Sequence, residues 1–95
     1  MMDVSILEKL AAVIQSRQTN RPAGSYTTYL FEQGQDKILK KLGEETAEVI
    51  IASKNQDKRP IIYEMADLVY HLMVLMAFHG LSWQDIFDEL EARYK

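Results

Sequence analysis

Two pairs of acidic residues, each pair spaced three positions apart, stand in segments that otherwise have the composition of core helices. The first pair is Glu45 and Glu48, and the second is Glu64 and Asp67. Residues three apart lie on one face of an α-helix, so each pair presents two carboxylates in one direction. If the two helices face each other, the four carboxylates form an oxygen-rich pocket for a hard divalent cation, of which Mg²⁺ is the usual physiological one.

The position of these carboxylates relative to the apolar residues makes the pattern informative. At about 100° per residue, Glu45 lies roughly 20° from Ile38, in the middle of an apolar stripe, and Glu48 lies at the edge of that stripe. Glu64 and Asp67 fall roughly 60° and 120° from the centre of the apolar stripe of the next segment. An ionised carboxylate on an apolar face is costly unless it is paired or bound to metal. For a single residue a solvated acidic edge is the better explanation, but the four together favour a metal site.

Basic residues flank the acidic motif on both sides. Lys37, Lys40 and Lys41 precede it, and Lys54 follows it. Lysines in these places suit an anionic ligand that is carried by a metal ion, and ordinary solvated lysines are the alternative. The net charge of −3 leaves no electrostatic footprint for nucleic acid over the molecule as a whole.

Length and composition fit one domain, residues 1–95, that buries a modest core and is expected to self-associate. The chain has no cysteine, which excludes disulfides, thiolate chemistry and a zinc–sulfur site. Its first residues have no basic region and no signal-like apolar segment. The longest nearly apolar run, residues 68–78, is too short to cross a membrane, so the default expectation is a cytoplasmic protein.

Hydrophobic periodicity predicts an all-α bundle of about four main helices. Apolar residues recur at intervals of three and four over residues 4–17, which indicates the first helix. Residues 19–24 form the clearest loop. A shortened capping box at residues 82–85 introduces the last helix, and its apolar face is formed by Trp83, Ile86, Phe87 and Leu90.

The acidic pairs fall on the two middle helices. The first runs from residue 35 to about 54 and the second from 60 to 79. Because the second is apolar almost all round, we expect it to be the most buried element. A short helical turn from Ser25 precedes them, and Gly34 ends this turn in the left-handed C-cap position.

Three further side chains could contact a substrate. The hydroxyls of Ser25 and Thr27 suit a phosphate or a sugar, although spacing alone favours helix capping. His71 lies on the side of its helix that carries Glu64 and Asp67. It could orient a carboxylate, contact substrate or be a satisfied core histidine, and the sequence leaves all three open.

Longer motifs around these residues resemble a known family. Glu44-Glu45-x-x-Glu48 followed by Glu64-x-x-Asp67 resembles the signature of the all-α nucleoside-triphosphate pyrophosphohydrolases, the MazG-like superfamily. The runs Ser-Tyr-Thr at residues 25–27, KKLGEETAEV at 40–49 and EMADLVYHL at 64–72 closely resemble the phosphoribosyl-ATP pyrophosphohydrolase family. The resemblance covers nearly the whole chain and shows no departure from the acidic pattern.

The resemblance implies an all-α fold that is completed by dimerisation. It also implies Mg²⁺-dependent hydrolysis of phosphoribosyl-ATP to phosphoribosyl-AMP and pyrophosphate, the second step of histidine biosynthesis. Many members are fused to the cyclohydrolase of the next step, and a chain of this length is expected to be the stand-alone form.

Carried over by position, the resemblance implies roles for individual residues. Glu45, Glu48, Glu64 and Asp67 would be metal ligands. Glu44, Glu45 and Glu48 are the candidates for the catalytic carboxylates, although Glu44 could instead pair with a neighbouring lysine. The candidates for substrate binding are Lys37, Lys40, Lys41, Lys54, Ser25, Thr27 and His71.

Three alternatives are considered. A house-cleaning pyrophosphohydrolase that acts on dUTP, dCTP or damaged nucleotides would carry the same acidic motif. A non-enzymatic helical association module would use the carboxylates only for structural cations. A di-iron helical bundle is disfavoured because it needs Glu-x-x-His pairs, and neither acidic pair is followed by histidine at that spacing.

Overall fold

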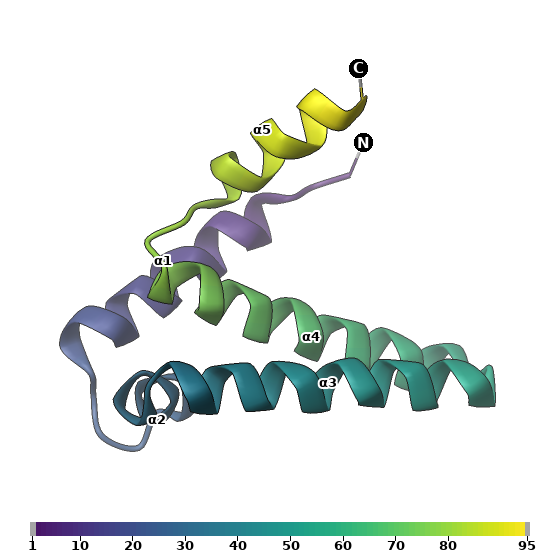
Figure 1. Cartoon of the computed structure of the whole chain (residues 1–95), viewed down its shortest axis with the longest axis horizontal. Coiled ribbons are helices and arrows are strands. Elements are labelled where there is room, and N and C mark those ends of the chain that lie inside the picture. The colour runs from purple at the N-terminus through teal and green to yellow at the C-terminus, as the bar shows by residue number, and fades with distance from the viewer. Residues whose placement is uncertain (1, 95) are drawn as a thin grey trace.

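The computed structural model describes residues 2–94, and this part of the chain contains five α-helices and no strand (Figure 1). The all-α prediction is confirmed, and the short turn expected after residue 25 is a complete helix of eight residues. The helices are α1 (Ser5–Asn20), α2 (Tyr26–Gln33), α3 (Gln35–Asn55), α4 (Lys58–Phe78) and α5 (Trp83–Tyr94).

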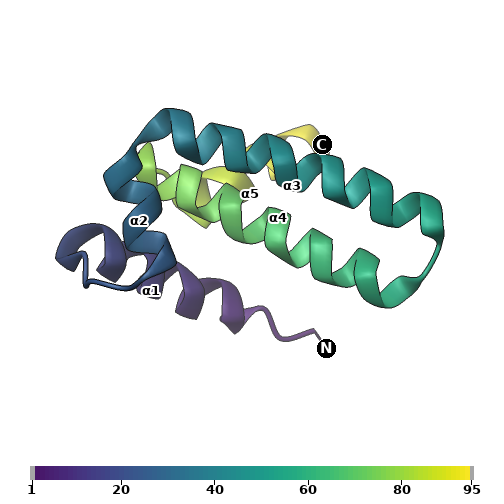
Figure 2. The ribbon, with the colours of Figure 1, turned by 90° about the horizontal axis from the view of Figure 1, so that it is seen from below.

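The two longest helices, α3 and α4, form an antiparallel hairpin that runs the length of the molecule (Figures 1 and 2). Helix α2 packs on α3, and α1 packs on both α2 and α4. As a result, α1, α2 and α5 gather at one end of the hairpin, and its other end projects away from them (Figure 1).

Short-range signals in the sequence set the helix boundaries. Ser25 caps α2, since its Oγ accepts the backbone N–H of Thr28 at 3.2 Å. Gly34 separates α2 from α3 with a φ of +91°, a conformation that side chains with a Cβ rarely adopt. Its N–H donates to the carbonyl of Leu30 at 3.1 Å and so closes the last turn of α2. Asp57 caps α4 through its side chain.

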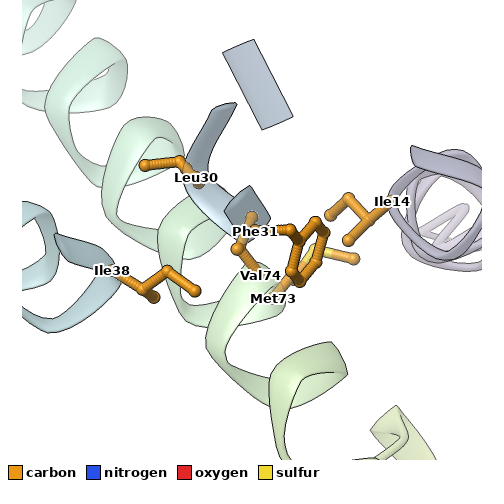
Figure 3. Packing of buried hydrophobic residues seen from close by; sticks show 6 residues of the cluster. All are labelled: Ile14, Leu30, Phe31, Ile38, Met73 and Val74. Atoms are coloured by element: carbon orange, nitrogen blue, oxygen red, sulfur yellow. The ribbon is translucent and has the colours of Figure 1, made fainter. Parts of the chain in front are cut away.

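The hydrophobic core lies where α1, α2, α3 and α4 meet, at the end of the hairpin (Figure 3). Burial of a large apolar side chain stabilises the folded state by about 1.5–3 kcal/mol. The packing of this cluster therefore fixes the register of α3 against α4. The acidic pairs lie farther along the hairpin, beyond the core. The buried apolar residues are Ile14, Leu30, Phe31, Ile38, Met73 and Val74.

The prediction that the second acidic helix is the most buried element is wrong for the single chain. Only three residues of α4 are buried, whereas half of α2 is buried. The reason is that α1 and α3 cover only part of α4, and its remaining apolar face has no neighbour among residues 2–94.

Helix α4 is also long and apolar enough to cross a membrane, with a mean hydropathy of 1.6. Core helices of soluble proteins pass the same test, so this property is weak evidence for a membrane span.

Candidate metal and substrate site

The hairpin brings the two acidic pairs together. Glu45 and Glu48 extend from α3, Glu64 and Asp67 extend from α4, and each offers a carboxylate oxygen within 4.8 Å of the others. The i, i+3 spacing places each pair on one face of its helix, and the antiparallel packing of α3 on α4 turns these two faces toward each other. The arrangement has the composition of a cation site, while the role of each carboxylate as a ligand stays a prediction.

Two oxygens of this cluster are buried without a partner. Glu45 is 5% exposed, and neither its Oε2 nor Oε1 of Glu64 has a hydrogen-bond partner among residues 2–94. A buried carboxylate oxygen that lacks a hydrogen bond is costly and needs an explanation. A hard divalent cation would satisfy both atoms, since Mg²⁺ and Ca²⁺ prefer oxygen ligands. The donor set of four carboxylates therefore fits the metal that the sequence predicts.

Crowding of negative charge changes the protonation of the cluster in the absence of metal. Burial raises the pKa of Glu45 from 4.5 to about 7, and two further causes act in the same direction: the protonated form can donate a hydrogen bond to Asp67, and the charges of Asp67 and Glu48 oppose ionisation. Burial also raises the pKa of Glu64, and this pKa rises further because the protonated form can donate a hydrogen bond to Glu48 and because the charges of Glu48 and Asp67 oppose ionisation. The cluster thus resists holding all its charges at neutral pH unless a cation is added.

Lys41 is the lysine that the structure brings to the cluster. Its Nζ lies 3.3 Å from Oε1 of Glu44 and 4.0 Å from Oε1 of Glu45. The hydrogen bond with Glu44 raises the pKa of Lys41, so its positive charge is secure. The pair with Glu44 is largely exposed and contributes little to stability, which leaves Lys41 free to exchange partners.

The other candidate lysines lie farther from the carboxylates. Lys37 is near the start of α3, with its Nζ 5.8 Å from the centre of the Tyr29 ring. Lys40 is exposed, and Lys54 is near the end of α3, roughly 9 Å along the helix axis beyond Glu48. The hairpin does not gather these three around the cluster, and their contact with substrate stays a prediction.

The two candidate hydroxyls already have partners within the protein. Ser25 uses its Oγ to cap α2. Thr27 is buried, and its hydroxyl is hydrogen-bonded to the hydroxyl of Tyr70 on α4. In this arrangement both groups tie α2 into the fold, and their predicted contact with substrate remains to be tested.

His71 is buried beside the carboxylates, and it has a partner that sequence reasoning missed. Its Nδ1 lies 2.8 Å from the backbone oxygen of Asp67, and its Nε2 lies 2.8 Å from the hydroxyl of Tyr26. Burial raises the pKa of Tyr26, so the phenol keeps its proton. The sequence signal that could have pointed to this contact was the position of Tyr26 within the Ser-Tyr-Thr motif. An aromatic residue at the start of a helix is usually explained by packing, so the motif alone did not indicate a hydrogen bond with His71.

Comparison with known proteins places these observations in a family. The family model for phosphoribosyl-ATP pyrophosphohydrolase matches residues 7–94. A phosphoribosyl-ATP pyrophosphatase of Pelotomaculum thermopropionicum is 57% identical over 93 residues, which cover 98% of this chain and 95% of the relative. One of Clostridium acetobutylicum is 53% identical over 88 residues, which cover 93% of this chain and 80% of the relative.

A fused relative matches as well. The histidine biosynthesis bifunctional protein HisIE of Caldanaerobacter subterraneus is 56% identical over 92 residues, which cover 97% of this chain but 45% of that protein. The chain therefore corresponds to less than half of this bifunctional relative.

Proposed function

The chain belongs to the phosphoribosyl-ATP pyrophosphohydrolase family, and from this premise we propose that it hydrolyses phosphoribosyl-ATP to phosphoribosyl-AMP and pyrophosphate with the help of Mg²⁺. Two relatives named for this hydrolase match it over 95% and 82% of their own length, and a fused relative is named for histidine biosynthesis. The observation that carries the metal-dependent reaction is the carboxylate cluster between α3 and α4, with its two buried and unpartnered oxygens.

The proposed metal ligands are Glu45, Glu48, Glu64 and Asp67. When bound, Mg²⁺ neutralises phosphate oxygens and makes the phosphorus under attack more electrophilic. The contribution of the protein is to place its four carboxylates close together, since the hairpin holds them in position before the substrate binds. Such preorganisation avoids the cost of rearranging charged groups during the reaction.

The exposed carboxylates of α3 are suited to handle the proton of the attacking water. Glu44 and Glu48 both face solvent, whereas Glu45 is buried beneath them. In the proposed reaction the water oxygen bonds to the α-phosphorus, the bond from this phosphorus to the bridging oxygen breaks, and pyrophosphate leaves with that electron pair. One of the two exposed carboxylates takes the proton of the water as general base.

Lys41 is suited to hold the triphosphate at the mouth of the cluster. The substrate and the carboxylates are both negative, so a cation from the protein must balance part of the charge. Lys41 is paired with Glu44 and close to Glu45, and it can transfer its hydrogen bonds to a phosphate oxygen.

We further propose that a homodimer buries the apolar face that α4 leaves open in the single chain. Near the turn between the two helices, Ile62 and Tyr63 of α4 and Ile50 and Ile51 of α3 are each more than half exposed. Soluble proteins seldom leave contiguous apolar patches uncovered. In this proposal residues 1–95 form one domain. We also propose a cytoplasmic location, in which α4 is a core helix whose apolar face is covered by the partner subunit.

The test is release of pyrophosphate from phosphoribosyl-ATP at saturating Mg²⁺, compared with release from dUTP, dCTP and other nucleoside triphosphates. We expect a clear preference for phosphoribosyl-ATP. We also expect Glu45→Gln and Asp67→Asn to abolish Mg²⁺-dependent turnover while circular dichroism shows a folded protein. Preference for an ordinary deoxynucleotide would favour the house-cleaning reaction instead, and no turnover with any nucleotide would favour a non-enzymatic association module.

A further inference from the structure

A chain of hydrogen bonds runs from the start of α2 through a buried histidine to the backbone of Asp67, and it places the histidine ring beside the Asp67 carboxylate. The hydroxyl of Tyr26 lies 2.8 Å from His71 Nε2. On the other side of the ring, His71 Nδ1 lies 2.8 Å from the backbone oxygen of Asp67 and 3.3 Å from its Oδ1. The imidazole is 2% exposed, so water has almost no access to it and these contacts account for both of its nitrogens.

The partners determine which nitrogen carries the proton in the neutral ring. Nδ1 faces a carbonyl oxygen and a carboxylate oxygen, both of which only accept hydrogen bonds, so Nδ1 must be the N–H donor. Nε2 then has a lone pair and accepts the hydroxyl hydrogen of Tyr26. His71 also lies close enough to Glu45 and Asp67 to share an ion with them, but in this arrangement neither nitrogen has a free lone pair for a metal.

Aromatic neighbours hold the ring in this orientation. The rings of Tyr26 and Tyr70 each meet the imidazole nearly edge-on, with centroids 5.7 Å away and interplanar angles of 74° and 82°. Thr27, the next residue of α2, bonds the hydroxyl of Tyr70. Two consecutive residues of α2 thus engage two consecutive residues of α4, and the imidazole cannot turn without breaking these contacts.

We propose that His71, held by Tyr26, is a positioning residue that keeps the Asp67 carboxylate turned toward the other three carboxylates and so raises the affinity of the cluster for a divalent cation. The side chain of Asp67 is 32% exposed, so without the His71 ring beside it the ionised carboxylate has room to rotate toward solvent. The Nδ1–H group donates to the backbone oxygen of Asp67, and its nitrogen lies 3.3 Å from Oδ1 of the same residue. The positive end of this N–H group therefore attracts Oδ1 electrostatically, while the other lone pairs of the carboxylate stay available for an ion. This inference rests on the proposed metal site.

Mn²⁺ binding, followed by the paramagnetic resonance of the free ion, tests the proposal without depending on turnover. His71→Leu removes the donor at similar volume, and we expect the Kd for Mn²⁺ to rise by about 10–100-fold. His71→Asn keeps an N–H group near the position of Nδ1 and should recover most of that loss. Tyr26→Phe removes only the hydroxyl and should weaken binding by a few fold. Two matched controls, Tyr29→Phe and His79→Asn, should leave the Kd unchanged.

The outcomes separate this inference from the proposed function. If the wild type binds no Mn²⁺, the metal site itself is refuted, and the inference with it. If the wild type binds Mn²⁺ and folded His71→Leu protein binds it equally well, only the positioning role is refuted, whatever the change in melting temperature. Should His71→Leu not fold, Tyr26→Phe with the wild-type Kd overturns the proposal.

Nuclear magnetic resonance gives a second and independent readout on the wild-type protein. Long-range proton–nitrogen correlations at about pH 8, where an ordinary histidine is neutral, distinguish the two tautomers. We expect His71 to carry its proton on Nδ1. A proton on Nε2 would contradict the hydrogen-bond chain from Tyr26 to Asp67 and overturn the proposal.

Discussion

Replacement of Glu45 by glutamine should stabilise the metal-free protein at neutral and alkaline pH. Folding raises the pKa of this carboxyl from 4.5 to about 7, so between these values the folded protein binds a proton that the unfolded chain releases. The free energy of unfolding must therefore decrease as the pH rises through this window. The stabilising contribution is fully present below about pH 4.5 and is lost above about pH 7. Glu45→Gln cannot ionise and should lack this decrease.

The size of the effect follows from the pKa shift. One pKa unit corresponds to about 1.4 kcal/mol, so the shift of Glu45 sets a ceiling of about 3 kcal/mol. Because Asp67 and Glu48 contribute to that shift and can relax, we expect the Gln variant to gain roughly 1–3 kcal/mol over the wild type at about pH 8. For a domain of this size, such a gain raises the melting temperature by roughly 5–15 °C.

Thermal unfolding followed by circular dichroism at about pH 5 and pH 8, with a chelator present, measures this difference. Glu8→Gln on α1, which removes an exposed carboxylate outside the cluster, is the matched control and should keep the wild-type pH dependence. Addition of Mg²⁺ at the higher pH should stabilise the wild type by mass action and leave Glu45→Gln unchanged. The reasoning is refuted if wild type and Glu45→Gln lose stability equally between the two pH values.

Two further predictions concern substrate and self-association. Lys41→Met should raise KM for phosphoribosyl-ATP about 10-fold with a smaller change in kcat, because it removes a charge-assisted hydrogen bond to phosphate, and steady-state kinetics beside Lys9→Met as control would measure it. An unchanged KM would remove Lys41 from the site. Ile62→Asp places a charge on the open face of α4 and should convert the proposed dimer to a monomer in sedimentation velocity, whereas an unaltered mass would show that this face is not the interface.

Local sequence was sufficient to predict the longer helices and to place their boundaries within a few residues, whereas α2 was predicted only as a turn. A period of 3.6 residues is visible without knowledge of the fold, and caps such as Ser25 and Gly34 act within four residues of their own position. The same local geometry predicts that each acidic pair shares one helix face. The family could be recognised for a related reason, since its motifs are short runs of neighbouring residues.

Tertiary packing determined which helix faces, and which side chains, lie opposite each other. The core contacts of Ile38 with the helices around it set the register of α3 against α4, and that register brings Glu45 to Asp67. The burial of α2, the open face of α4 and the bond from Tyr26 to His71 depend in the same way on helices distant in the chain. Helical periodicity indicates which face of a helix is apolar, but the partner of that face is chosen by side-chain packing, and packing depends on the whole fold.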